Sequence, residues 1–192
     1  MTITTALEEG CFYHIYNRGN NREVIFKDSS NYLYFLALLE KYIIPVADVF
    51  AYCLLNNHFH FLVKIRDDYN GEKFKPQQNF SNFFNAYAKS FNLSNHRTGK
   101  LFQERFKRKK IEDDFYFTEL IHYIHANPQK HKLLADFRNY QYSSYKSMLS
   151  NNETILKRDE VMAWFGGKKS FEESHANRQI FLTETRYFEN LQ

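Results

Sequence analysis

Two histidines separated by a single residue are the part of this sequence that most directly suggests chemistry. They are His58 and His60, within residues 57–63. On a β-strand, alternate side chains point to the same face, so both imidazoles would lie on one face and Phe59 and Phe61 on the other. Two imidazoles on one face could hold a metal ion together. With eight histidines in 192 residues, the expected number of His-x-His pairs that arise by chance is roughly one third. Two ordinary core or surface histidines are therefore the alternative interpretation.

A second motif, YIHANP at residues 123–128, could supply a nucleophile and a further ligand. Tyr123 and Asn127 are four residues apart, so on a helix they share one face, with roughly 5–6 Å between their Cβ atoms. The carbonyl oxygen of Asn127 could join the two imidazoles, and such a mixed nitrogen and oxygen set suits Mg²⁺ or Mn²⁺ better than a thiolate-rich zinc site does. Taken separately, Tyr123 is explained as well by a core position, and Asn127 by a helix end before Pro128.

Patterns that would indicate a different chemistry are weak or absent. His122 and His125 are three residues apart and could ligate zinc with a carboxylate, but no His-Glu-x-x-His signature accompanies them. The sequence also has no Walker loop, no glycine-rich dinucleotide fingerprint and no Ser/His/Asp order. These absences narrow the classes of enzyme to be considered.

A run of basic residues indicates an anionic partner. The chain carries 26 basic and 22 acidic residues, a modest net charge of +4, but five basic residues fall within residues 105–110 and Lys100 lies just upstream. Aromatic residues make up 18% of the chain, and aromatic faces beside cations suit the exposed bases of single-stranded nucleic acid, where stacking contributes roughly 1–3 kcal/mol per base. The alternatives are a solvated basic hairpin and a large, phenylalanine-rich core.

Local patterning predicts a strand, a helix, two strands, a helix, a basic extended segment and a helix, in that order. They are expected near residues 12–17, 28–45, 46–65, 80–93, 101–111 and 115–127. An N-cap at Asp28, a tight turn at residues 56 and 57 and a stop at Pro128 mark boundaries. A loop is expected over residues 66–78, and two short helices over residues 160–165 and 171–187.

The interleaved order favours an α+β fold with a central antiparallel sheet, because strands joined by a tight turn must run antiparallel. A chain of 192 residues with 43% hydrophobic content can bury one good-sized core. We therefore expect one domain over residues 1–149 and a helical C-terminal extension over residues 150–192.

Cysteine usage and hydropathy predict the compartment. The only two cysteines are Cys11 and Cys53, which argues against a disulfide framework and for a reducing, cytoplasmic setting. The first ten residues lack a basic region followed by an apolar one, and no apolar run approaches the roughly 18 residues that a membrane span requires. We expect no membrane association.

Five stretches of the chain form a specific combination. In chain order they are YHIYNRGNNREVIF from Tyr13, LLNNHFHFLV, GKLFQERFK, YIHANP, and SSY at residues 143–145. Together, and at this spacing, they resemble the single-tyrosine HUH transposases, specifically the REP-associated tyrosine transposases. The resemblance covers about residues 12–149.

This resemblance implies a ferredoxin-like α+β core in which His58 and His60 bind a divalent ion, Mg²⁺ or Mn²⁺. Tyr123 would attack DNA, and Asn127 would be the third ligand. The implied reaction cuts and rejoins single-stranded, hairpin-containing DNA through a 5′-phosphotyrosine intermediate, in a monomer or homodimer, with no organic cofactor. The candidate DNA-binding residues are Arg18, Lys100, Arg105, Lys107, Arg108, Lys109 and Lys110.

Two other functions remain open at this point. A non-catalytic regulator could bind hairpin DNA or RNA on the same fold, and a metal-dependent hydrolase would use water in place of Tyr123. The chain also departs from the family pattern, which often has Met-Pro where Leu55 and Asn56 stand here, and a small, arginine-containing sequence at residues 129–132. These departures could alter the fit to DNA, but they remove no catalytic group.

Overall fold

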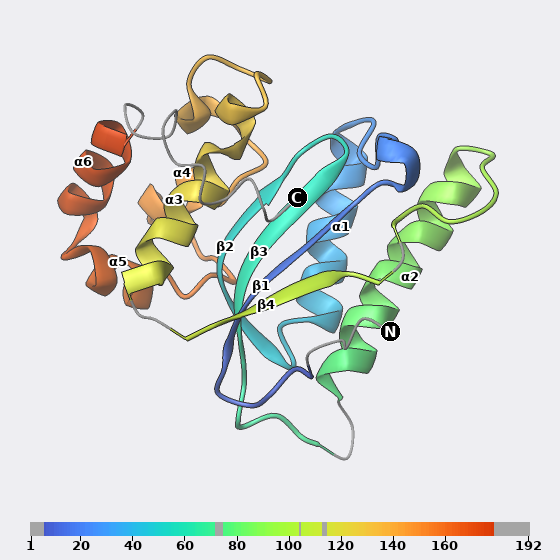
Figure 1. Ribbon diagram of the computed structural model, residues 1–192, viewed down its shortest axis with the longest axis horizontal. Coiled ribbons are helices and arrows are strands. Elements are labelled where there is room, and N and C mark those ends of the chain that lie inside the picture. The colour runs from blue at the N-terminus through green and yellow to red at the C-terminus, as the bar shows by residue number, and fades with distance from the viewer. Residues whose placement is uncertain (1–5, 72–74, 104, 113–114, 179–192) are drawn as a thin grey trace.

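An antiparallel sheet of four strands carries the helices of this protein, in a computed structural model that describes residues 6–71, 75–103, 105–112 and 115–178 (Figure 1). The strands are β1 (Phe12–Arg18), β2 (Ala47–Leu54), β3 (His58–Ile65) and β4 (Lys107–Ile111). Their order in the sheet is β2-β3-β1-β4, and each neighbouring pair is antiparallel. With one helix after β1 and another between β3 and β4, this is the βαββαβ arrangement of a ferredoxin-like fold. The predicted α+β class is confirmed.

Helices cover both faces of this sheet. Within the described residues they are α1 (Ser29–Tyr42), α2 (Pro76–Ser94), α3 (Phe115–Lys130), α4 (Tyr145–Leu149), α5 (Arg158–Phe165) and α6 (Lys168–Arg178). Two short 3₁₀ helices, η1 (Asn20–Arg22) and η2 (Phe137–Asn139), lie in the connections. α1 and α2 lie on one face, and α3 to α6 gather beyond the other, beside β2 (Figure 1). None of the described helices is long and apolar enough to cross a membrane.

The face that α1 and α2 cover is the phenylalanine-rich side of the core. α1 begins after Asp28, whose carboxylate accepts from the backbone N–H of Asn31 at 3.1 Å, and this confirms the predicted N-cap. Phe35 of α1 contacts Phe59 and Phe61 of β3, with ring centroids 5.2 and 6.1 Å apart. Alternate residues of β3 thus point into this layer, as the sequence predicts.

The tight turn predicted between the two central strands joins β2 to β3. Leu55 N donates to His58 O at 2.8 Å and closes the turn. The carbonyl of Asn56, within the turn, accepts from Ile25 N at 2.8 Å. The turn is therefore bound to the segment that precedes α1, which helps to set the register of β3.

Among the helix boundaries that differ from the prediction, those at Pro76 and Pro128 have a clear physical reason, whereas α1 ends at Tyr42, short of the expected residue 45, and α5 and α6 begin two and three residues early. The loop predicted over residues 66–78 ends earlier than expected, because α2 starts at Pro76. In the first turn of a helix the backbone N–H groups have no helical acceptor, so a proline there breaks no helical hydrogen bond. The predicted stop at Pro128 is wrong, because α3 continues through it. Pro128 lies close to the end of α3, where it removes only one helical hydrogen bond. The bond that follows is kept, because His131 N donates to Asn127 O at 2.9 Å. Asn127 therefore lies inside the helix.

The predicted C-terminal helices are present, and α5 packs on the sheet. Trp164 of α5 stacks on Phe50 of β2, with ring centroids 4.9 Å apart and an interplanar angle of 14°. α5 ends at Gly166, whose φ of 77° is a left-handed conformation that glycine adopts without strain. The helix predicted over residues 171–187 is observed as α6 up to Arg178, and residues 179–187 of that prediction lie outside the described residues. α4 has no counterpart among the predicted elements.

Gly19, directly after β1, is the described glycine at which an added Cβ would make the closest contact. Its N–H donates to Asn57 O at 2.8 Å, and a Cβ here would overlap the carbonyl oxygen of Glu23. We expect Gly19→Ala to lower the free energy of unfolding by roughly 1–3 kcal/mol, because the backbone must shift. Urea denaturation followed by circular dichroism measures the change. Gly71→Ala is the control, since among the described residues its methyl would meet only Tyr69, at 3.9 Å; equal losses in both variants would contradict the prediction.

Candidate functional site

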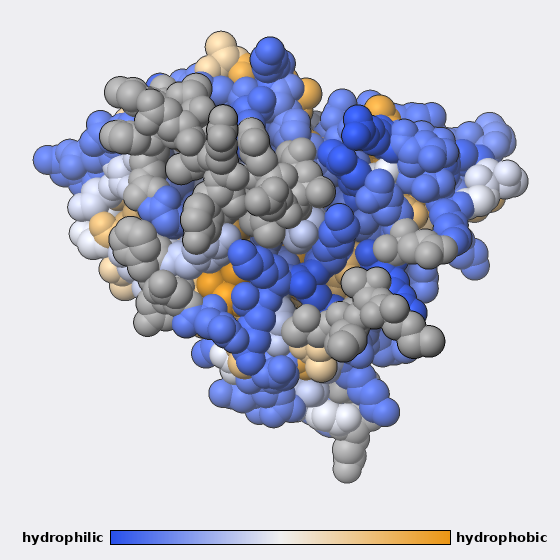
Figure 2. All heavy atoms as spheres, in the orientation of Figure 1, coloured by the Kyte–Doolittle hydropathy of each residue, from blue (hydrophilic) through white to orange (hydrophobic). Residues whose placement is uncertain are grey.

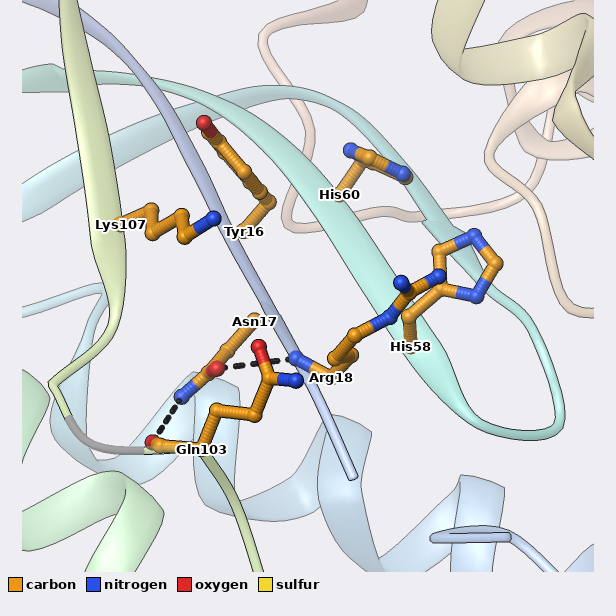
Figure 3. Close-up of a pocket in the computed structure, with 7 residues that line it drawn as sticks. All are labelled: Tyr16, Asn17, Arg18, His58, His60, Gln103 and Lys107. Carbon is orange, nitrogen blue, oxygen red and sulfur yellow. Dashed lines mark hydrogen bonds between the residues drawn. The ribbon is translucent and has the colours of Figure 1, made fainter. Parts of the chain in front are cut away.

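The face of the sheet opposite α1 and α2 carries a row of polar and aromatic side chains. In the antiparallel register, Tyr16 and Arg18 of β1 lie opposite His60 and His58 of β3, respectively. We call the hollow over them the histidine cleft. It is lined by Tyr16, Asn17, Arg18, His58, His60, Gln103 and Lys107 (Figure 3). The two imidazoles thus share one face of β3, and the phenylalanines between and beyond them share the other.

Each of the two cleft histidines has one ring nitrogen engaged and one available. Nδ1 of His58 lies 2.6 Å from Oδ1 of Asn57. Because that oxygen only accepts, Nδ1 carries the proton and Nε2 of His58 keeps its lone pair. Nδ1 of His60 lies 2.9 Å from Nε2 of His14. The Nε2 atoms of both His58 and His60 are buried and have no hydrogen-bond partner among the described residues, an arrangement that is costly unless a ligand uses the lone pairs.

His14 is a site residue that the sequence analysis did not single out. It lies in β1, is fully buried, and its ring stacks on that of His60 with centroids 5.1 Å apart and an interplanar angle of 22°. When His60 donates from Nδ1, Nε2 of His14 accepts, and Nε2 of His60 remains unprotonated. The alternation Tyr-His-Ile-Tyr predicts that His14 and Tyr16 share a face. Which strand lies beside them is decided only by the sheet order.

Tyr123 and Asn127 approach the cleft histidines from α3. The Tyr123 ring lies edge-on to His60, with centroids 5.4 Å apart, and to His14, with centroids 6.1 Å apart. Asn127 donates from Nδ2 to the backbone carbonyl of Tyr123 at 2.7 Å, and its buried Oδ1 has no hydrogen-bond partner within the described chain. Lys130 places Nζ 5.3 Å from the centroid of the Tyr123 ring. The structure therefore brings together the four residues that the sequence analysis selected.

Burial keeps the imidazoles of the site neutral. Desolvation lowers the pKa of His14 and of His58 to about 3, and it lowers the pKa of His60 well below its usual value. The charge of Arg18 acts in the same direction on His58, whereas the side chain of Asn127 raises the pKa of His58. At neutral pH these rings are therefore uncharged, which is the state in which an imidazole binds a metal ion.

The atoms that lack partners define what the site can hold. Across the described ranges, no group of three or more His, Cys, Asp or Glu side chains is arranged to hold a metal ion. The set at this site is different, since it consists of two imidazole Nε2 atoms and one amide oxygen, from His58, His60 and Asn127. Such a set suits a divalent ion that accepts both nitrogen and oxygen ligands, such as Mn²⁺ or Mg²⁺.

The basic residues of the predicted run do not form a single surface. Lys107 lines the histidine cleft, and Lys109 points to the same face of the sheet, where its Nζ lies 3.4 Å from the hydroxyl of Tyr116. Arg108 and Lys110 alternate to the opposite face. Of the remaining candidates, Arg18 lines the cleft, whereas Lys100 and Arg105 line a separate groove beside α2.

A second group of histidines lies behind the site, between α3 and α6. Nδ1 of His125 is 2.9 Å from Nε2 of His175, and Nε2 of His125 is 2.7 Å from Oγ of Ser144. Nε2 of His122 is 2.8 Å from Oγ of Ser174. Both ring nitrogens of His125 are thus engaged in hydrogen bonds, so this group serves to dock helices on one another.

Comparisons with known proteins show a shared fold. No protein-family model and no curated protein matches this chain. Among solved structures, the chain is similar to a REP-associated tyrosine transposase bound to a REP hairpin, with a TM-score of 0.59 and 16% sequence identity. The similarity covers 81% of this chain and 89% of that one. The two proteins therefore have the same arrangement of sheet and helices.

The buried histidines predict how stability depends on pH. Burial lowers the pKa of seven histidines in the described part of the folded chain: His14, His58, His60, His122, His125, His131 and His175. In the unfolded chain, histidine binds a proton below about pH 6.5, so there the unfolded state binds more protons than the folded state. The stabilisation is complete above about pH 7. It falls by up to about 1.4 kcal/mol per pH unit for each histidine as the pH decreases further.

Urea denaturation between about pH 7.5 and 5.5 tests this expectation, because carboxylates titrate mostly below that range. A free energy of unfolding that stays constant or rises as the pH falls would show that the imidazoles are not held neutral by the fold.

Proposed function

We propose that this protein cuts and rejoins single-stranded DNA through a covalent bond to Tyr123, with a divalent metal ion held by His58, His60 and Asn127. The observation that carries the proposal is the convergence of a tyrosine from α3 with two imidazoles whose Nε2 atoms have no hydrogen-bond partner in the described part of the chain. Strand and helix reach one place from positions far apart in the chain. None of these residues would be sufficient for the proposed reaction by itself.

The residues of the site fit such an ion. Two neutral imidazoles and an amide oxygen supply lone pairs, and Asn57 and His14 orient the rings through their Nδ1 atoms. When bound, the ion would draw charge from the non-bridging oxygens of a phosphodiester and favour the phenolate of a nearby tyrosine. The protein's own part is to hold the ligands neutral, buried and correctly oriented.

In the proposed reaction, the Tyr123 oxygen attacks the phosphorus of a DNA phosphodiester. A bond forms between that oxygen and phosphorus, the bond from phosphorus to O3′ breaks, and the phenol proton is lost to the surrounding groups while O3′ gains one. The products are a 5′-phosphotyrosine and a free 3′-OH, and attack by a 3′-OH reverses the step and joins strands without ATP. Because Tyr123 is only 2% exposed, the groups that cover it must move aside when DNA enters.

The choice of DNA as the partner has two supports. The neighbouring solved structure is a transposase bound to a REP hairpin. In this chain, Arg18 and Lys107 line the histidine cleft beside Tyr16, and the Nζ of Lys107 lies 5.8 Å from the centroid of the Tyr16 ring. A cation and an aromatic face beside the site suit a phosphate and an unstacked base of a single strand.

One observation favours a second candidate function. The enclosure of Tyr123 is also what a regulator would show if it binds hairpin DNA or RNA without cutting it. Such a protein would keep the basic and aromatic side chains of the cleft and would not need an accessible nucleophile. The two candidates differ in whether a covalent adduct forms.

The adduct assay separates these functions. A labelled hairpin oligonucleotide with single-stranded flanks is incubated with Mn²⁺ or Mg²⁺, and protein-linked label is measured on a denaturing gel. We expect an adduct with the unaltered protein and none with Tyr123→Phe, because phenylalanine has no oxygen to attack phosphorus. Tyr116→Phe, on the same helix, is the control and should retain the adduct.

Each other result of that assay has a definite meaning. An adduct of unchanged yield in Tyr123→Phe would refute the assignment of the nucleophile. Binding with no adduct and no nicking under either metal would support the regulator. A nicked strand without linked protein would indicate a hydrolase that uses water.

Metal binding is expected to depend on the available Nε2 atoms and on the hydrogen bond that orients His60. Calorimetric titration with Mn²⁺ should show a large loss of affinity in His58→Ala and a loss of roughly tenfold in His14→Leu, which removes the acceptor for Nδ1 of His60. His14→Gln, which restores an acceptor, should recover most of the affinity. Thermal unfolding of each variant identifies any loss that is due to misfolding. Equal Mn²⁺ affinity in all folded variants would exclude this metal site.

A further inference from the structure

A second hollow lies on the other side of the sheet edge from the histidine cleft, between α2 and the segment that leads into β4. It is a groove of about 730 Å³. We call it the α2 groove; it is lined by Asn17, Ser81, Phe84, Asn85, Ala88, Gly99, Lys100, Leu101, Phe102, Gln103, Arg105 and Phe106. The surface over the side that carries α2 is mostly hydrophilic (Figure 2).

The α2 groove and the histidine cleft are adjoining spaces. Asn17 and Gln103 line both of them. At this point the segment before β4 is held to β1, because Gln103 N donates to Arg18 O at 2.9 Å and Nδ2 of Asn17 donates to Gln103 O at 3.3 Å. A chain molecule that occupies the cleft can therefore continue past Gln103 into the groove.

We propose that the α2 groove is a second nucleic-acid-binding site, which holds the phosphodiester backbone of the same strand that enters the histidine cleft. This inference rests on the proposed function for the identity of the cleft ligand. It gives a defined binding place to Lys100, Arg105 and Arg108, which the sequence analysis named only as candidate DNA-binding residues. The main residue is Arg108.

Arg108 lies at the end of the groove and has donors that no described residue accepts from. A pocket of about 380 Å³ adjoins the groove and is lined by Gln77, Ser81, Arg105, Phe106 and Arg108. The guanidinium of Arg108 lies over the ring of Phe106, 4.7 Å from its centroid, and its Nε and Nη1 atoms are buried without a hydrogen-bond partner among the described residues. Buried N–H groups of a charged side chain are costly to leave without an acceptor. A phosphate oxygen is an acceptor of the required charge.

The helix side of the groove suits a backbone that must come close. Ser81, Asn85 and Ala88 lie at intervals of four and three residues, on one face of α2, and all line the groove. They are small or uncharged, and the described lining residues of the groove and its pocket include no acidic side chain. Nothing described in the lining would therefore repel a phosphate.

Lys110 provides a matched comparison within the same strand. It points to the same face of β4 as Arg108 and carries the same charge, but its Nζ is paired with the carboxylate of Glu8 at 2.5 Å. It lines neither the groove nor its pocket. A general loss of positive charge on β4 would affect both residues equally, whereas a phosphate site at Arg108 would not.

The first experiment measures binding to a fluorescein-labelled hairpin oligonucleotide with single-stranded flanks, by anisotropy over a range of salt concentrations. We expect Arg108→Gln to weaken binding roughly tenfold at low salt and to reduce the slope of log affinity against log salt by about one. Lys110→Gln should change the affinity by less than about twofold. Equal effects of the two substitutions would overturn the proposal.

The second experiment detects the strand directly. Photo-crosslinking from p-benzoylphenylalanine introduced at position 85 should capture the labelled oligonucleotide. The same group at position 169, where the side chain is 89% exposed on α6, beyond the other face of the sheet, should not. Failure to capture at position 85, or displacement of the oligonucleotide by an acidic peptide at equal charge concentration, would show that the groove is not a nucleic-acid site.

These measurements separate the groove from the chemistry of the cleft. If Arg108→Gln weakens binding while no variant of the protein forms an adduct, the groove is supported and the catalytic proposal fails. If adducts form with Tyr123 intact but Arg108→Gln binds as well as the unaltered protein, the catalytic proposal is supported and the groove is overturned.

Discussion

The central position of β3 is the constraint on which the rest of the structure depends. β3 pairs with β1 on one side and with β2 on the other, so its side chains must alternate strictly between the two faces. His58 and His60 face α3, while Phe59 and Phe61 face α1. A shift of one residue in register would exchange the two sets and bury the imidazoles among phenylalanines. Core packing and the candidate site therefore require the same register.

The second requirement is that α3 docks at one position on β2. His125 of α3 is hydrogen-bonded to Ser144 at 2.7 Å, and Oγ of Ser144 accepts from Tyr52 N of β2 at 2.9 Å. These bonds lie behind the site and tie the helix to the strand. They hold the face of α3 that carries Tyr123 and Asn127 toward the cleft. The proposed chemistry consequently depends on buried polar contacts that never touch a substrate.

Most of the local structure could be predicted because it depends on residues close together in the chain. The N-cap at Asp28 and the turn between β2 and β3 are of this kind. The errors at Pro76 and Pro128 have one cause. A proline breaks a helix only where its N–H is needed, and packing decides how far the helix extends on either side. For the same reason, the continuation of α3 beyond Asn127 could not be predicted from the proline that follows it.

The sequence by itself determined that His58 and His60 share a face of a strand and that Tyr123 shares a helix face with the residue four positions later, since both periodicities are local. Only the tertiary structure decided that these two faces meet, that His14 engages His60 across 46 positions of the chain, and that Arg108 points away from the cleft. The physical reason is that strand order and register arise from contacts between distant segments. Alternation reveals which side chains lie together, but the neighbouring strand determines what they meet.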